Sequence, residues 1–282
     1  MTDPINSDQP QFKWQNPKPQ FDVGRVLRRT FSAIKNNFVK FGLLSFVIVG
    51  LPMFFVGLWP LLLYGGEGIL AGNTMNDGLL IGTLVGAMGG GLLYFLLYAL
   101  AQSVLVHACF KDFAGEKVSL RLSLKKSLSL LFPLIGLIVL YMLGVFFGFI
   151  LFLIPGLLLL LGWYVCIPVL LVEKRSVTES LGRSWELTKG YKRWVLLIVI
   201  ILWVISTVIS VLLTLLSVPF GDPNMAVITG GSATFWIVYA LASAAAQAIA
   251  VLITASSVAA VYFEIRDLKE GITPESIASV FD

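Results

Sequence analysis

An unbroken stretch of 46 residues without a charged side chain, residues 127–172, constrains the fold more than any other feature. As one helix it would be about 69 Å long, more than twice the roughly 30 Å thickness of a bilayer core. The stretch must therefore fold back on itself. We place the reversal between Gly148 and Pro155-Gly156, because proline removes a backbone donor and glycine accepts a tight turn.

Four more uncharged stretches complete the pattern, and each is long enough to cross a bilayer once. The chain is 57% hydrophobic and only 13% charged, about half the charged fraction of a soluble domain, which excludes a soluble enzyme. We predict an all-α polytopic membrane protein with six spans. The predicted spans are 42–63, 85–110, 128–148, 152–172, 195–217 and 235–263.

All the lysines and arginines fall on one side of this six-span arrangement. Seven precede the first span, five lie between the second and third, six between the fourth and fifth, and two follow the sixth. The intervening connections contain none. Because positively charged loops remain in the cytoplasm, the pattern predicts that both termini are cytoplasmic.

The ends of the chain are expected to lie outside the membrane domain. Residues 1–20 have no apolar core, so we do not expect a signal peptide, and their Pro, Gln and Asn content predicts a disordered cytoplasmic arm. Residues 21–267 form the predicted membrane domain, and 268–282 a short cytoplasmic tail.

A short pattern occurs three times, once in each of the first three basic segments. A helix-capping residue is followed five positions later by Leu, then by any residue, a base, a hydroxyl residue and an apolar residue. The copies are Asp22, Leu27, Arg29, Thr30, Phe31; Ser119, Leu124, Lys126, Ser127, Leu128; and Ser176, Leu181, Arg183, Ser184, Trp185. Each copy precedes two spans, which predicts a threefold repeat of one helix and two spans. Lys111-Asp112 and Arg266-Asp267, 155 positions apart, support a duplication.

The three short segments have apolar residues at helical spacing, with bases on the other side. A basic amphipathic helix next to a span is typical of a helix that lies in the membrane interface. Such helices can serve only as anchors. Alternatively, their bases attract anionic lipid headgroups. On that second interpretation Arg29, Lys126 and Arg183 contact headgroups, with Thr30, Ser127 and Ser184 as hydrogen-bonding companions.

Residues 152–197 resemble a bacterial family that includes the YciC-type inner-membrane proteins, and the membrane domain of some glycerophosphoryl diester phosphodiesterases. The matching positions are Pro155, Gly156, Pro168, Val169, Glu173, Arg183, Ser184, Lys189 and Gly190. The resemblance implies a bacterial inner-membrane protein with a link to glycerophospholipid metabolism. It does not imply catalysis, because the soluble catalytic domain of those enzymes has no counterpart in this chain.

No set of residues points to catalysis. His107 is the only histidine and cannot build a metal site alone, and Cys109 and Cys166 have no basic neighbour that would activate a thiol. The predicted spans hold no charged residue, whereas ion-coupled transporters usually place ionisable groups there. We expect no enzymatic activity, cofactor or metal, and no nucleic-acid partner, since the bases follow the membrane edges.

The polar and small residues inside the spans leave several functions open. Gln102 and Gln247 can hydrogen-bond between spans, and small residues recur every four positions in the second and sixth spans, a pattern of close helix packing. We expect those two faces to pack on each other or to form a dimer contact. Anionic glycerophospholipid is the expected partner. The alternatives are a passive or weakly coupled path for a neutral or amphiphilic solute, lined by Gln102, Ser103, Thr254 and Ser256, and a scaffold subunit with a membrane-protein partner.

Overall fold

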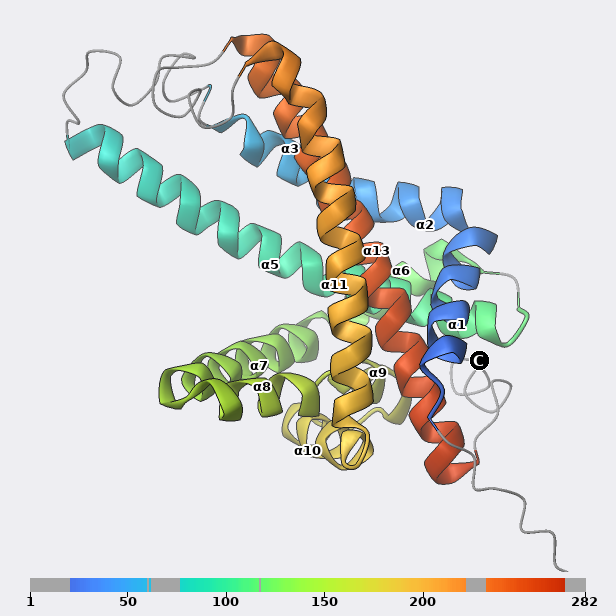
Figure 1. Ribbon diagram of the computed structural model, residues 1–282. Coiled ribbons are helices and arrows are strands. Elements are labelled where there is room, and N and C mark those ends of the chain that lie inside the picture. Colours follow the sequence, from blue (N-terminus) through green and yellow to red (C-terminus); the bar gives the residue numbers. More distant parts are fainter. Residues whose placement is uncertain (1–20, 60, 62–76, 117, 222–231, 272–282) are drawn as a thin grey trace, which may run out of the picture.

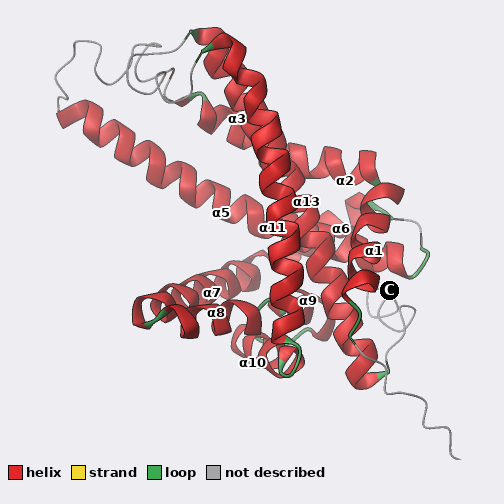
Figure 2. Ribbon diagram, viewed as in Figure 1, coloured by secondary structure: helices red, strands yellow, loops and turns green. Residues whose placement is uncertain are grey.

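The computed structural model describes residues 21–59, 61, 77–116, 118–221 and 232–271, and within these ranges every regular element is a helix (Figures 1 and 2). The all-α prediction is therefore confirmed. The predicted disordered arm, residues 1–20, and residues 272–282 of the predicted tail lie outside the described residues. The helices are α1 (Val23–Asn36), α2 (Phe38–Ser45), the π-helix η1 (Phe46–Gly50), α3 (Leu51–Gly57), α5 (Asp77–Phe113), α6 (Leu120–Ser129), α7 (Leu131–Leu151), α8 (Leu153–Gly162), α9 (Cys166–Glu173), α10 (Val177–Thr188), α11 (Lys192–Thr214), the 3₁₀-helix η2 (Leu215–Phe220) and α13 (Ala233–Glu270).

Six helical segments are long and apolar enough to cross a membrane, so the protein is a multi-pass integral membrane protein. In chain order we call them spans 1 to 6. They are Phe38–Gly57, Leu84–Phe113, Leu131–Leu151, Leu153–Glu173, Lys192–Phe220 and Ala233–Glu270. Each overlaps the corresponding predicted span, and span 6 continues past the predicted end at residue 263 through a charged last turn.

The long uncharged stretch reverses inside the predicted interval. Phe152 adopts an extended conformation between α7 and α8, with φ −165° and ψ 157°. The two helices then run back along each other at very short range: a Cβ on Gly148 would lie 2.9 Å from the Cα of Gly156. Both glycines are therefore required by the close approach of the two backbones.

Two spans are irregular where the sequence predicts continuous helix. Span 1 contains η1 immediately before Pro52, whose ring nitrogen cannot donate to the carbonyl of Ile48. The wider π turn accommodates that missing hydrogen bond. Span 4 is interrupted between Gly162, the last residue of α8, and Cys166, the first residue of α9.

The buried core is built from the second span of each repeat unit. Its largest buried stretches are 99–110 of α5, 165–172 around α9, and 251–265 of α13. Away from this core the spans diverge: the N-terminal half of α5 and the α7–α8 pair point away from α11 and α13 (Figure 1). Their outer surfaces expose large apolar side chains, which suits contact with lipid.

α5 and α13 pack against each other, as predicted for spans 2 and 6, and residues of both small-residue faces also contact span 1. A Cβ on Gly57 of span 1 would lie 3.0 Å from the Cβ of Ala240 in span 6. On span 2, a Cβ on Gly90 would lie 2.9 Å from Cγ1 of Val56. Span 1 therefore contacts both faces, because each glycine or alanine lets a neighbouring helix approach closely.

The three copies of the repeated pattern form α1, α6 and α10, which we call the basic layer. Each of these helices packs on the second span of the preceding unit: α6 on α5, and α10 on α9. The first helix, α1, packs on α13, the last span of the third unit. The arrangement is therefore cyclic, and we call these three contacts the α1–α13, α5–α6 and α9–α10 joints.

Candidate functional site

Each helix of the basic layer begins at the residue that the repeated pattern predicts. Asp22 caps α1 and accepts a hydrogen bond from the backbone N–H of Arg25, 3.2 Å away. Ser176 caps α10 and forms a capping box with Glu179. Ser119 occupies the same position at α6 without a side-chain cap bond. The local signal in the sequence therefore predicts all three helix starts.

The hydroxyl residue of each copy is fully buried. Thr30 donates to the carbonyl of Val26 on its own helix, Ser127 accepts from Ser103 on α5, and Ser184 donates to the carbonyl of Gly162. Two of these bonds link the basic layer to a span, so these hydroxyls help to dock their helices. Contact between the three hydroxyls and lipid headgroups stays a prediction.

An ion pair closes the α1–α13 joint. Glu264 of α13 has no exposed side-chain surface, and its carboxylate accepts from Arg29 at 2.8 Å. Arg25 of the same helix lies 3.3 Å from the other carboxylate oxygen. Burial lowers the pKa of Arg29, although the charge of Glu264 opposes this shift. Arginine stays protonated under these conditions, so the joint joins charged groups of opposite sign.

A second set of ion pairs closes the α9–α10 joint and connects it to α13. Arg183 of α10 donates to Glu173 at the end of α9 at 3.1 Å, and also to Glu270 of α13. Tyr262 of α13 donates to the same Glu173 at 3.3 Å. Burial lowers the pKa of Arg183, but its bonds with Glu270 and Glu173 outweigh burial and raise it overall. Like Arg29, the predicted headgroup base Arg183 therefore binds carboxylates of the protein itself.

The α5–α6 joint differs from the other two joints, because the side-chain hydrogen bonds described across it involve uncharged groups. Besides the bond between Ser103 and Ser127, the His107 ring lies 2.9 Å from the hydroxyl of Ser123. Lys126, the base of this copy, has no ion pair among the described residues. Within the described part of the chain, Lys126 is the only one of the three predicted headgroup bases without an ion pair.

The sequence does not predict which carboxylates these arginines bind. Glu173 and Glu264 each follow the apolar part of a second span, which is the available signal in the sequence. The pairing itself joins residues 235 positions apart in one case. Such a contact follows from the cyclic arrangement of the helices and is not visible in local spacing.

Polar side chains form hydrogen bonds within and between the core helices. Tyr94 of α5 donates to Gln247 of α13 at 3.1 Å, which confirms the predicted bond between spans for Gln247. Gln102 instead donates to Tyr98 one turn earlier on its own helix, at 2.9 Å. The carbonyl oxygen of Gln102 is buried and has no hydrogen-bond partner among the described residues. Tyr164 adds a bond to Ser257 at 3.0 Å.

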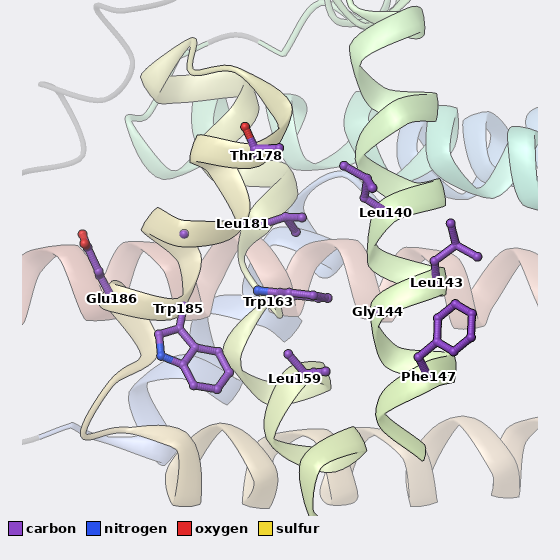
Figure 3. A pocket seen from close by; sticks show the side chains of 11 residues that line it. Leu140, Leu143, Gly144, Phe147, Leu159, Trp163, Thr178, Leu181, Trp185 and Glu186 are labelled. Carbon is purple, nitrogen blue, oxygen red and sulfur yellow. The ribbon is translucent and has the colours of Figure 1, made fainter. Parts of the chain in front are cut away.

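An apolar groove of ≈ 800 Å³ lies between α7, α8 and α10 (Figure 3). Trp163 points across it toward Gly144 of α7, and Glu186 points away from the apolar side chains. The groove is lined by Leu140, Leu143, Gly144, Phe147, Leu159, Trp163, Thr178, Leu181, Gly182, Trp185 and Glu186. At its edge, the ammonium group of Lys192 lies 3.0 Å from the ring centroid of Trp185.

The groove belongs to the lipid-facing side of the membrane domain. Phe147 and Leu143 line it and are also exposed on the outer surface of α7. Its third wall is α10, an amphipathic helix of the basic layer. A groove of this volume is in the range that holds a small ligand, and its wall chemistry suits a hydrocarbon chain.

The described residues contain no group of three metal-binding side chains, and Cys109 and Cys166 are buried free thiols. Comparison of the whole chain with protein-family models, curated proteins and solved structures gave no match. The function is therefore argued from the geometry above.

Proposed function

We propose that this protein is a non-enzymatic integral protein of the bacterial inner membrane that binds glycerophospholipid. The observation that carries the proposal is the apolar groove between two membrane spans and an amphipathic basic-layer helix. The resemblance of residues 152–197 to inner-membrane proteins linked to glycerophospholipid metabolism supports the same conclusion. In this proposal the basic layer and both termini face the cytoplasm, where anionic lipid attracts lysine and arginine.

An acyl chain is the occupant that the groove fits best. Its wall is almost entirely aliphatic and aromatic, and it opens beside exposed apolar side chains of α7 that would contact lipid. Trp185 with Lys192 stands at its edge, as expected where an acyl chain meets a polar headgroup. A chain held there would extend from the interface into the hydrocarbon core.

A photoactivatable phospholipid with a diazirine on its acyl chain tests this proposal. In native membranes we expect crosslinks to groove residues such as Leu143 and Leu181. Gly182 lines the groove, and a Cβ placed on it meets nothing within 4 Å, so Gly182→Phe is chosen to occupy the groove with its ring. Gly89→Phe is the matched control, because Gly89 is equally open and lies on α5. Loss of crosslinking only in Gly182→Phe supports the proposal, and equal labelling of all three proteins contradicts it.

A second candidate function is a passive path for a small neutral solute. The buried carbonyl oxygen of Gln102, which has no hydrogen-bond partner among the described residues, favours it, because a buried polar atom ordinarily has a partner, and a solute or water can supply one. Tyr98 and Ser257 add buried or partly buried polar groups between the same helices. Solute flux into liposomes that falls in Gln102→Leu supports this candidate, and flux equal to that of protein-free liposomes contradicts it.

A further inference from the structure

Among the described residues, a carboxylate forms an ion pair across two of the three joints of the cyclic arrangement, and none does so across the α5–α6 joint. Arg29 binds Glu264, and Arg183 binds Glu173. In the register set by Lys111-Asp112 and Arg266-Asp267, the residue of α5 that corresponds to Glu264 is Cys109. Cys109 has no carboxylate, and its buried thiol donates to Ser256 of α13, so this position gives the α5–α6 joint no negative charge.

Lys126, the base of the α5–α6 joint, belongs to a cluster of three positively charged side chains without ion pairs among the described residues. α6 carries Arg121, Lys125 and Lys126, and it contains no acidic residue. None of the three has an ion pair among the described residues, in contrast to Arg29 and Arg183. Arg121 and Lys125 are one helical turn apart on the same side of α6, and Lys126 lies about 100° further round the helix, so the three charges spread over adjacent sides of one short helix.

We propose that the α5–α6 joint binds an anionic phosphate group, which supplies the negative charge that Glu264 and Glu173 supply at the other two joints. The inference rests on the proposed lipid binding and names the headgroup chemistry. Lys126 is the central contact, with Arg121 and Lys125 beside it. A phosphodiester has oxygens that accept charge-assisted hydrogen bonds from such bases.

The surface around these bases indicates a phospholipid as the source of the phosphate. Leu122 and Leu128 of the same helix are 65% and 49% exposed. Apolar side chains beside three bases match an amphiphile, whose headgroup binds the bases while its chains cover the leucines. A soluble phosphate would leave both leucines in water.

Binding of phosphatidylglycerol to the full-length protein, measured by native mass spectrometry, tests the inference. Phosphatidylcholine with the same acyl chains and soluble glycerol phosphate are the comparison ligands. The test variant is Arg121→Gln/Lys125→Gln/Lys126→Gln. The matched control, Arg28→Gln/Lys35→Gln/Lys40→Gln, removes three exposed bases elsewhere in the described chain. The control bases lie on α1 and α2, so the control measures the general attraction between basic residues and anionic lipid. Each base near a membrane surface changes binding about fivefold, so we expect the test variant to lose about 10-fold more binding than the control.

Each outcome has a definite meaning. If the test variant binds phosphatidylglycerol as tightly as the wild type, or if the test and control variants lose binding equally, the proposed phosphate site is overturned. The proposed acyl-chain groove is not affected by either result. Glycerol phosphate that binds as tightly as phosphatidylglycerol supports the phosphate site and assigns it to a soluble ligand. If groove crosslinking and phosphatidylglycerol binding are both absent in the wild type, the proposed function itself fails. Lys126→Gln alone, with its fold checked by gel filtration, should lose about fivefold, and no loss overturns the central role of Lys126.

Discussion

Glu264 accepts a hydrogen bond from Arg29 at 2.8 Å, and this bond joins the last membrane helix to the first helix of the basic layer. The two residues are 235 positions apart. The contact completes the cyclic order in which every basic-layer helix packs on the second span of the preceding repeat unit. The chain is therefore a closed arrangement of three units, with the first helix fixed by the last.

Removing this carboxylate charge should destabilise the membrane domain. Glu264→Gln removes the charged partner of Arg29 and leaves Arg25 with only its long pairing to Asp22, and a hydrogen bond between charged groups contributes about 1.5–3 kcal/mol. We expect the free energy of unfolding to fall by about 2 kcal/mol, because Arg29 remains partly exposed to water. Unfolding in mixed micelles, monitored by circular dichroism, measures the change.

Glu186→Gln is the control for that measurement. Its side chain is 72% exposed, and its pairing with Arg183 at 3.9 Å is long, so the change should be under about 0.5 kcal/mol. Equal stability of the Glu264→Gln variant and the wild type would show that the buried pair does not hold α1 in place.

The close contact between spans 1 and 6 predicts a strong effect of side-chain size at Gly57. Gly57→Leu forces its side chain against Ala240, so we expect a loss of about 1–3 kcal/mol of stability. Gly89→Leu introduces the same side chain at a position where an added Cβ would have no atom within 4 Å. Thermal unfolding of the two variants in the same detergent makes the comparison, and a Gly57→Leu variant no less stable than Gly89→Leu would contradict the packing.

The proposed orientation can be measured by chemical labelling from one side of the membrane. We expect a membrane-impermeant maleimide to label Lys35→Cys and Arg121→Cys only in inside-out vesicles. Leu216→Cys, at the other end of span 5, should react only in right-side-out vesicles. The native Cys109 and Cys166 give little background because both are buried. Labelling of all three positions from one side would contradict the six-span topology.

The capping box of α10 predicts a local dependence on pH. Hydrogen bonds from the backbone and hydroxyl of Ser176 lower the pKa of Glu179 below its usual value of 4.5. A carboxylate whose pKa is lowered by folding stabilises the helix start above pH 4.5, and this stabilisation is lost as the pH falls through the lowered pKa. Hydrogen exchange in the first turn of α10 should therefore accelerate under acid, beyond its intrinsic pH dependence. Glu179→Gln should remove that extra acceleration, and an unchanged acid response in this variant would contradict the assignment.

Local patterns predict the parts of the fold that depend on neighbouring residues. The uncharged stretch 127–172 requires a reversal, and its glycines and proline place the turn where Phe152 breaks the helix. Capping residues predict the starts of α1, α6 and α10. These features follow from backbone donors, helix length and burial, which are properties of short segments.

Long-range partners could not be predicted in the same way. The spacing of Ala240 and Gly90 shows that each lies on a small-residue face, but it does not show that span 1 is the shared neighbour. The bases Arg29 and Arg183 are visible in the sequence, whereas Glu264 and Glu173, which they bind, come from other repeat units. The groove likewise depends on how three separate helices meet, so it has no signature in the sequence.

The contact between α1 and Glu264 also sets an order of events during biosynthesis. A ribosome adds about 5–20 residues per second, so roughly 10–50 s pass between the synthesis of Arg29 and that of its partner. Throughout that interval α1 has been made but lacks its contact with α13. The packing of an early helix is therefore completed only late, and a nascent chain released before residue 264 leaves α1 without this anchor.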